Sequence, residues 1–300
     1  MKVLNFGSLN VDYVYMVDEF LLPGETKPAL ERNIIPGGKG LNQSVALARA
    51  GAEVYHAGII GNDGGILLEA LTKNNVRTDF LLSDSDVGGH TIIQVDKKGQ
   101  NKIILFGGTN KKYTKAFIDK TLTGFASGDI VLVQNETNLV DYIIVKASEK
   151  GIKTVFNAAP ISREVLDYPL GLVDWLIVNE GEGAVLAGTE KPDEILKNLS
   201  ERYKKTTIFL TLGPEGCCCS SQEGTFSMEA IPVSNIVDTT AAGDTYIGYL
   251  IKAHIDGLQI REAMVKASVA SSLSIQKLGA STSVPSSSEV EKAFREWTSR

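Results

Sequence analysis

Cysteine is nearly absent from this chain of 300 residues, and the three that occur are adjacent, at Cys217, Cys218 and Cys219. Neighbouring residues of a strand point to opposite faces of a sheet, and this spacing matches no common metal site. We therefore expect reduced cysteines on a strand, which indicates a cytoplasmic protein. The three histidines are scattered and no HExxH motif occurs, which disfavours a zinc enzyme.

Long hydrophobic runs and basic blocks are missing as well. No apolar run approaches the roughly 18 residues that a membrane-spanning helix needs, and the first residues, 1–7, read as a strand and not as a signal peptide. The formal net charge of −6 disfavours nucleic acid and anionic membranes as main partners, although small anions such as nucleotides stay possible. Neither GxxxxGK[ST] nor a GxGxxG following a strand is present, so two common nucleotide-binding devices are excluded.

What the chain does have is enough apolar sequence for a large core, since 43% of its residues are hydrophobic and 22% are charged. From residue 115 onward, strands predicted at 130–134, 154–157, 175–178 and 207–212 alternate with helices at 139–150, 180–187 and 192–203. Val131–Val133 is apolar at successive positions, which is typical of a strand covered on both faces. The alternation predicts an α/β fold with a mainly parallel sheet, followed by an antiparallel hairpin at 217–220 and 225–229 and helices at 241–256, 259–276 and 287–299.

The first half has a similar pattern but contains two interruptions. Its predicted elements are strands at 2–8, 54–60 and 79–82 and helices at about 40–50 and 64–74. Hairpins with the character of exposed sheet occur at about 13–36 and 88–108. They predict a small β lid on one α/β domain that spans residues 1–300. The free edges of such a lid need covering, which favours a homodimer formed lid to lid.

The segment Val237–Thr245, with the sequence VDTTAAGDT, precedes the helix predicted at 241–256. Thr240 can serve as the N-cap of that helix. The next amides, those of Ala241, Ala242 and Gly243, can bind an anion because the first N–H groups of a helix are unpaired. Asp244 would repel a bound phosphate, but it suits a residue that takes a proton from a hydroxyl attacking that phosphate. A capped helix with an ordinary first-turn acid is the alternative.

Polar or glycine-rich segments also follow several other strands, at the sheet edge where open α/β folds bind ligands. They are Asn10 with Asp12, Gly37–Gly40 with Asn42, Asn135-Glu136, Asn179–Glu182 and Thr211–Gly216. Each one has a structural alternative, such as an Asx turn, a glycine hinge, a capping box or a tight turn. Their recurrence at corresponding strand ends favours a shared ligand site.

Together these segments resemble the ribokinase/PfkB-type carbohydrate kinases over essentially the whole chain, and within that family the ribokinase branch. Gly37–Asn42 is similar to the first family signature, and Asp238–Asp244 to the second, more specific one. The resemblance implies a three-layer α/β/α sandwich with a small lid. It also implies transfer of the γ-phosphoryl of ATP to the terminal hydroxyl of a sugar, with D-ribose and ribose 5-phosphate as the expected substrate and product. The alternatives are a family kinase for fructose, 2-keto-3-deoxygluconate or a nucleoside, or a non-catalytic regulator that binds a sugar or nucleotide.

The resemblance also implies roles for individual residues. Asp244 corresponds to the general base, and the amides of Ala241, Ala242 and Gly243 correspond to the anion hole. The sugar would contact Asn10, Asp12, Gly38, Lys39, Asn42, Glu136 and Asp244. ATP would contact Asn179, Thr211, Gly213, Gly216 and Gly243. Glu182 corresponds to an N-x-x-E position tied indirectly to Mg²⁺, and a monovalent cation, usually K⁺, would lie near Asp238, Thr240, Ser274, Lys277, Gly279 and Ser283.

Overall fold

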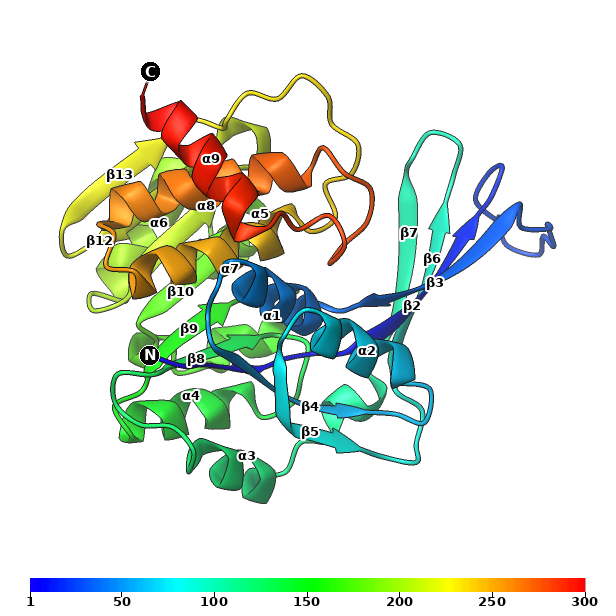
Figure 1. Cartoon of the computed structure of the whole chain (residues 1–300), viewed down its shortest axis with the longest axis horizontal. Coiled ribbons are helices and arrows are strands. Elements are labelled where there is room, and N and C mark those ends of the chain that lie inside the picture. Colours follow the sequence, from blue (N-terminus) through cyan, green and yellow to red (C-terminus); the bar gives the residue numbers. More distant parts are fainter. Residues whose placement is uncertain (300) are drawn as a thin grey trace.

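The computed structural model describes residues 1–299 and contains a sheet of nine strands and a separate sheet of four (Figure 1). The large sheet has the order β13-β12-β11-β10-β9-β8-β1-β4-β5. In chain order its strands are β1 (Val3–Phe6), β4 (Val54–Ile60), β5 (Arg77–Ser83), β8 (Ile130–Gln134), β9 (Lys153–Asn157), β10 (Trp175–Asn179), β11 (Thr207–Thr211), β12 (Cys217–Ser221) and β13 (Gly224–Met228). From β5 at one edge to β11, all neighbouring strands are parallel. The last two pairs, β11–β12 and β12–β13, are antiparallel. The predicted parallel sheet with an antiparallel edge hairpin is confirmed.

Helices cover both faces of the large sheet and complete three layers. They are α1 (Lys39–Arg49), α2 (Gly65–Lys73), α3 (Lys115–Leu122), α4 (Val140–Glu149), α5 (Glu180–Ala187), α6 (Pro192–Arg202), α7 (Ala242–Ile255), α8 (Ile260–Ser274) and α9 (Ser287–Thr298). One buried core contains side chains of α1, α2, α7, α8 and α9, and the other contains those of α3 to α6. Strand β1 supplies both, because Val3 belongs to the first core and Leu4 to the second.

The close packing of α7 on α1 depends on one glycine. A Cβ placed on Gly248 of α7 would lie 2.5 Å from the Cβ of Ala46 in α1, so a larger residue would push the two helices apart. Asp244 lies one turn before Gly248 on α7. The glycine therefore helps to bring Asp244 next to the first turns of α1.

The small sheet has the order β3-β2-β6-β7 and extends away from the body (Figure 1). Its strands are β2 (Asn10–Met16), β3 (Glu31–Gly37), β6 (Gly89–Val95) and β7 (Asn101–Phe106). Strands β6 and β7 fall in the second predicted hairpin region, whereas β2 begins before the first region, at Asn10, and β3 ends after it, at Gly37. The two hairpins join each other because β2 and β6 pair in parallel. The exposed large apolar residues of this sheet include Ile34, Ile92, Ile103, Ile104, Leu105 and Phe106.

Some details differ from the expectations or extend them. Helix α3 is absent from the predicted elements, although Thr114 caps it by accepting a hydrogen bond from the Phe117 amide and Ile118 and Leu122 bury its inner face. The cysteines are buried and free on β12, as expected. Within residues 1–299, no helix has the length and apolar character needed to cross a membrane.

Candidate active site

Nine of the predicted site residues line two hollows at the carboxyl ends of the parallel strands. The larger hollow has a volume of about 410 Å³ and lies between the small sheet and the body, where it is lined by Asn10, Asn110 and Glu136 among others. The smaller, of about 120 Å³, is lined by residues that include Lys39, Asn157, Asn179, Glu182, Thr211, Thr240, Gly243 and Asp244. A hydrogen bond of 3.1 Å from the Lys39 amide to Glu136 Oε2 links the walls of the two hollows.

Glu136 holds the glycine-rich turn before α1 in place. Its Oε2 accepts hydrogen bonds from the Lys39 amide and from the Ser8 hydroxyl. The Ser8 hydroxyl oxygen in turn accepts from the Gly40 amide at 3.1 Å. The turn also needs a glycine at position 38, where φ is +95°. The predicted sugar contacts Gly38, Lys39 and Glu136 are thus one connected unit, to which Ser8 belongs although the sequence did not single it out.

Asn10 and Asp12 both lie on β2, and Asn10 lines the larger hollow from the small sheet. Asn10 Oδ1 accepts a hydrogen bond of 2.7 Å from Asn110 Nδ2, and Asp12 Oδ1 accepts one of 2.6 Å from the Thr91 hydroxyl. Burial raises the pKa of Asp12 to about 6, against the lowering effect of the Thr91 hydrogen bond and with a further rise from Glu136. Asn110 and Thr91 were not predicted as site residues.

The glycines that flank β2 leave room for these polar side chains. A Cβ on Gly89 would lie 2.4 Å from Asn10 Oδ1, and a Cβ on Gly37 would lie 1.9 Å from Asp12 Oδ2. Gly37 and Gly89 both pair with Asn10 across the sheet. The small sheet therefore carries the two polar residues only because its neighbouring strands have no side chain at these positions.

Asp244 lies in the first turn of α7, where its exposed fraction is 7%. Its Oδ1 accepts a hydrogen bond of 2.8 Å from Gln43 Nε2, and its Oδ2 accepts one of 3.1 Å from Asn42 Nδ2. Burial raises the pKa of Asp244, and Lys39, Gln43 and Asn42 oppose that rise. The result is a buried carboxyl group that faces the smaller hollow and the amide side chains of α1.

Lys39 supplies positive charge between three carboxyl groups. Burial lowers its pKa, but Asp244, Glu136 and Glu182 raise it by more, so that the net pKa lies above the ordinary value. The lysine therefore stays charged at neutral pH. This position gives an otherwise acidic site a cation that can attract phosphate.

The start of α7 differs from the prediction in its cap. The N-cap is Ala241, which makes no side-chain capping bond. The prediction that Thr240 caps α7 is wrong, because the Thr240 hydroxyl donates a hydrogen bond to Asp238 Oδ1. Of the predicted anion-hole amides, that of Ala242 donates to Thr239 O at 3.2 Å, whereas within residues 1–299 no group accepts from those of Ala241 and Gly243. A Cβ on Gly243 would meet nothing within 4 Å, so the space beside this residue is open.

The predicted nucleotide residues also take part in the fold. Asn179 and Glu182 form a capping box at the start of α5, with bonds of 2.9 Å from the Glu182 amide to Asn179 Oδ1 and from the Asn179 amide to Glu182 Oε2. The structural alternative for this motif is therefore confirmed, and its contact with ATP stays a prediction. Thr211 ends β11, and Gly213 and Gly216 follow it with φ of +53° and +103°. A Cβ on Gly216 would lie 2.1 Å from Met228 O, so the neighbouring strand requires this glycine.

The predicted cation ligands lie on two loops that Asp238 ties together. Its Oδ1 accepts hydrogen bonds from the Thr240 amide and hydroxyl, and its Oδ2 accepts one of 2.9 Å from the Gly279 amide. Burial raises the pKa of Asp238, but these hydrogen bonds lower it by more, so the net pKa lies below the ordinary value.

The other three predicted cation ligands direct their side chains elsewhere. The hydroxyls of Ser274 and Ser283 donate to Ser271 O and Ala280 O, and Lys277 pairs with Glu289. Lys277 can thus reach a cation only through its backbone carbonyl, whereas the hydroxyl oxygens of Ser274 and Ser283 keep lone pairs beside their carbonyls. No group of three or more His, Cys, Asp or Glu side chains in residues 1–299 is arranged to hold a metal ion.

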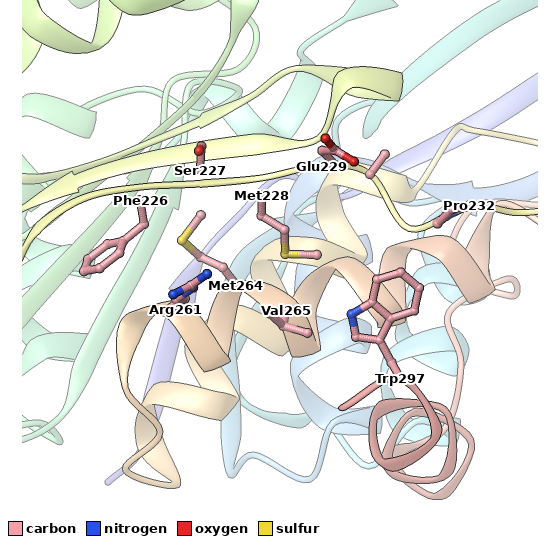
Figure 2. Close-up of a pocket in the computed structure, with 10 residues that line it drawn as sticks. Phe226, Ser227, Met228, Glu229, Pro232, Arg261, Met264, Val265 and Trp297 are labelled. Carbon is pink, nitrogen blue, oxygen red and sulfur yellow. The ribbon is translucent and has the colours of Figure 1, made fainter. Parts of the chain in front are cut away.

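A third hollow, of about 340 Å³, lies between β13 and the helices α8 and α9. Figure 2 shows Phe226 and Met228 of β13 facing Met264 and Val265 of α8, with Trp297 of α9 beside them. None of the predicted site residues lines it. It is therefore separate from the two hollows around Asp244 and Glu136.

Comparison with known proteins places the chain among sugar kinases. The family described as pfkB family carbohydrate kinase matches residues 1–287. Ribokinase of Haemophilus influenzae is 34% identical over 292 residues, which cover 94% of this chain and 95% of that protein. The bifunctional ribokinase/ribose-5-phosphate isomerase A of Fructilactobacillus sanfranciscensis is 35% identical over 295 residues, and the chain spans about half of its length, 54%. The structure of Arabidopsis thaliana ribokinase complexed with ribose and ATP superposes with a TM-score of 0.86 at 28% identity, over 98% of both chains.

Proposed function

The chain belongs to the pfkB family of carbohydrate kinases, and from that premise we propose that it transfers the γ-phosphoryl of ATP to D-ribose, giving ribose 5-phosphate. The observation that carries the proposal is the buried pair of Asp244 and Asn42. Asn42 donates to Asp244 through Nδ2, and its Oδ1 is buried with no hydrogen-bond partner among residues 1–299. A buried acceptor without a partner needs a donor, and a sugar hydroxyl beside the base supplies one.

In the proposed reaction Asp244 acts as the general base. It takes the proton of the terminal hydroxyl while the sugar oxygen bonds to the γ-phosphorus and the bond to the β-phosphate oxygen breaks. The amides of Ala241, Ala242 and Gly243 form the anion hole, in which those of Ala241 and Gly243 have no acceptor within residues 1–299. Lys39 balances the charge of the transferring group.

The sugar lies in the larger hollow, and ATP approaches from the smaller one. The hydroxyls of the sugar are held by Asn10, Asp12 and Asn42. These residues lie beside the turn formed by Gly38, Lys39 and Glu136. The nucleotide contacts Asn179, Thr211, Gly213, Gly216 and Gly243. Residues 1–300 form a single kinase domain in which the lid segments, at about 13–36 and 88–108, close over the sugar and exclude water.

Both proposed metal ions fit the oxygen-rich character of the site. Mg²⁺ bound with ATP would neutralise phosphate charge, and Glu182 would orient it indirectly, since both of its carboxylate oxygens already accept hydrogen bonds from Asn179. K⁺ would lie near Asp238 and Thr240, with backbone carbonyls of Ser274, Lys277, Gly279 and Ser283. A cation at that position stiffens the loop that leads into the anion hole.

A homodimer formed lid to lid follows from the apolar face of the small sheet. Ile104 and Phe106 on the edge strand β7 are 65% and 52% exposed, which is unusual for side chains of this size on a monomer surface. Replacing Ile104 with Glu should convert the dimer to a monomer, measured by light scattering. A wild-type protein that is monomeric at micromolar concentration would contradict this part of the proposal.

The substrate is tested by an ADP-release assay on pentoses, hexoses, 2-keto-3-deoxygluconate and nucleosides. We expect D-ribose to give the highest kcat/KM. A higher value for fructose, 2-keto-3-deoxygluconate or a nucleoside would assign the chain to another kinase of the family. If none of these acceptors is phosphorylated, although sugar and ATP bind, the alternative of a non-catalytic regulator holds.

A further inference from the structure

A row of buried polar side chains lies under α1 and ends at Asp244. Its members are Asn5 of β1, Gln43 and Ser44 of α1, His56 of β4, Gln134 of β8 and Asn157 of β9, and their exposed fractions are 6% or less. Buried amides are costly unless every donor and acceptor finds a partner, so such a row in the middle of a core calls for a function. None of these side chains has a part in the sugar or phosphate contacts described above.

The direction of the row is fixed at one end by the carbonyl of Gly40. Asn5 Nδ2 donates to Gly40 O at 2.8 Å, and since a carbonyl only accepts, the amide nitrogen of Asn5 must face α1. Asn5 Oδ1 therefore faces Gln134 and accepts from its Nε2 at 3.0 Å. The same Nε2 donates to Gln43 Oε1 at 2.8 Å. It follows that the nitrogen of Gln43, and not its oxygen, points at Asp244.

A second carbonyl fixes Gln43 from the other side. Asn157 Nδ2 donates to Ile177 O at 3.2 Å, which directs Asn157 Oδ1 toward Gln43. Gln43 Nε2 donates to that oxygen at 3.1 Å and to Asp244 Oδ1 at 2.8 Å. A flipped Gln43 amide would bring its oxygen against two acceptors and its nitrogen against the Gln134 nitrogen. Gln134 on one side and Asn157 on the other therefore both keep the Nε2–H of Gln43 directed at the Asp244 carboxylate.

The remaining branch of the row is uncharged. Ser44 Oγ accepts from Asn5 Nδ2 at 2.8 Å. Because the carbonyl of Gly7 beside His56 Nε2 only accepts, the Nδ1 of the neutral ring accepts the proton of Ser44, also at 2.8 Å. His56 then carries its proton on Nε2 and donates to Gly7 O at 3.1 Å. Burial lowers the pKa of His56 to about 4, so the ring is neutral at neutral pH. The charged groups that do act on Asp244 are Lys39 of α1, Glu136 after β8 and Glu182 of α5.

We propose that Gln43 is a positioning residue that aims the proposed base, Asp244, and that two backbone carbonyls set its direction through Asn5, Gln134 and Asn157. This inference rests on the proposed function. Gln43 is fully buried, with an exposed fraction of 0%, and lines neither hollow. With Oδ1 held by Gln43, the oxygen on the Asn42 side, Oδ2, receives the proton of the sugar hydroxyl. The donated N–H also favours the charged form of the carboxyl group, against the effect of burial.

The first test is Gln43→Met, which keeps the length of the side chain and removes the donor. We expect kcat at neutral pH to fall about 10- to 100-fold with little change in the KM of sugar and ATP, since a displaced base costs turnover. In the pH profile of kcat, the acid limb should move to higher pH, because the carboxyl group loses a hydrogen bond that favours its charged form. Gln134→Met, which removes the partner of Gln43 without touching Asp244, should move the limb in the same direction by less.

A loss of kcat that is uniform over pH, with the acid limb unmoved in both variants, would overturn the proposal and leave Gln43 a packing residue. Because Gln43→Met could fail to fold, thermal melting is measured for each variant, and Gln134→Met alone then decides the outcome.

A readout that needs no turnover separates this inference from the proposed function. A carbon-13 NMR titration of the aspartate carboxyl groups, with Asp244→Asn used to assign the signal, should show Asp244 titrating at higher pH in Gln43→Met than in the wild type. An unchanged midpoint overturns the inference, whatever the substrate is. A raised midpoint in a protein that phosphorylates no sugar supports the inference and contradicts the proposed function alone.

Discussion

Asp238 and Asp244 lie in the same short segment, and their surroundings give them opposite properties. Asp244 is buried and receives hydrogen bonds from two side-chain amides, and its pKa is raised. Asp238 is half-exposed and receives bonds from the backbone amides of Thr240 and Gly279 and from the Thr240 hydroxyl, and its pKa is lowered. Two carboxyl groups whose environments separate their pKa values are suited to different roles.

The difference shows why one segment can serve both proposed roles. A proton acceptor needs a carboxyl group that can be protonated during the reaction, and burial beside Asn42 and Gln43 supplies that. A residue that helps to hold a cation must stay charged throughout, and the backbone amides around Asp238 supply that.

The largest effect is expected from Asp244→Asn, which keeps the shape of the side chain and removes the base. Turnover should fall by about 10²–10⁴, the usual contribution of a general base. ATP affinity, measured by calorimetry, should stay close to that of the wild type, because the amides and Lys39 are unchanged. Near-normal turnover of this variant would show that the hydroxyl loses its proton to another group.

A smaller effect is expected from Asp238→Asn, and it should depend on the cation. In wild-type protein we expect K⁺ to raise kcat, because a cation near Asp238 stiffens the anion-hole loop. The variant should lose most of that activation, a change of roughly tenfold, and keep its activity in the absence of K⁺. Assays in K⁺ and in a large organic cation at equal ionic strength provide the measurement. Equal K⁺ activation in both proteins would move the cation site elsewhere.

The sequence predicted most of this fold because its apolar runs are long and its turns are marked. The strands from β8 to β11 are apolar at successive positions, and their helices begin and end within a few residues of the predicted bounds. Helix α3 was missed because it is short and only Ile118, Thr121 and Leu122 of its residues are buried. The parallel pairing of β2 with β6 could not be foreseen, since nothing in either hairpin encodes its partner in the other.

The site was predicted less completely than the fold. Motif spacing located Asn42 and Asp244, which lie 3.1 Å apart through their side chains although 202 positions separate them. The same spacing said nothing about Gln134 or Asn157, because a polar residue within a strand has no local signal for its partner. The cap of α7 was mispredicted for a related reason, since the competing acceptor, Asp238, is also a neighbour in sequence. The direction of such hydrogen bonds depends on which side chains meet in the fold.

The smallest expected effect is on stability. Replacing Asp244 and replacing Asp238 with Asn should change the melting temperature in opposite directions. Asp244 has a raised pKa, so the folded state disfavours its charge, and Asp244→Asn should raise the melting temperature at pH 7. Asp238 has a lowered pKa, so its charge contributes stability above the pKa of the unfolded chain, and that stability is lost as the pH falls through the folded pKa.

Asp238→Asn should therefore lower the melting temperature at pH 7, by a change in unfolding free energy of about 1 kcal/mol. The amide nitrogen of Asn cannot accept, so at least one of the three accepted hydrogen bonds is lost on a half-exposed group. The difference from wild type should shrink as the pH is lowered below the ordinary pKa of aspartate toward the lower pKa of the folded state. Scanning calorimetry of the two variants at several pH values measures both signs. If both substitutions destabilised the protein equally at every pH, the two carboxyl groups would not differ in the way that their hydrogen bonds indicate.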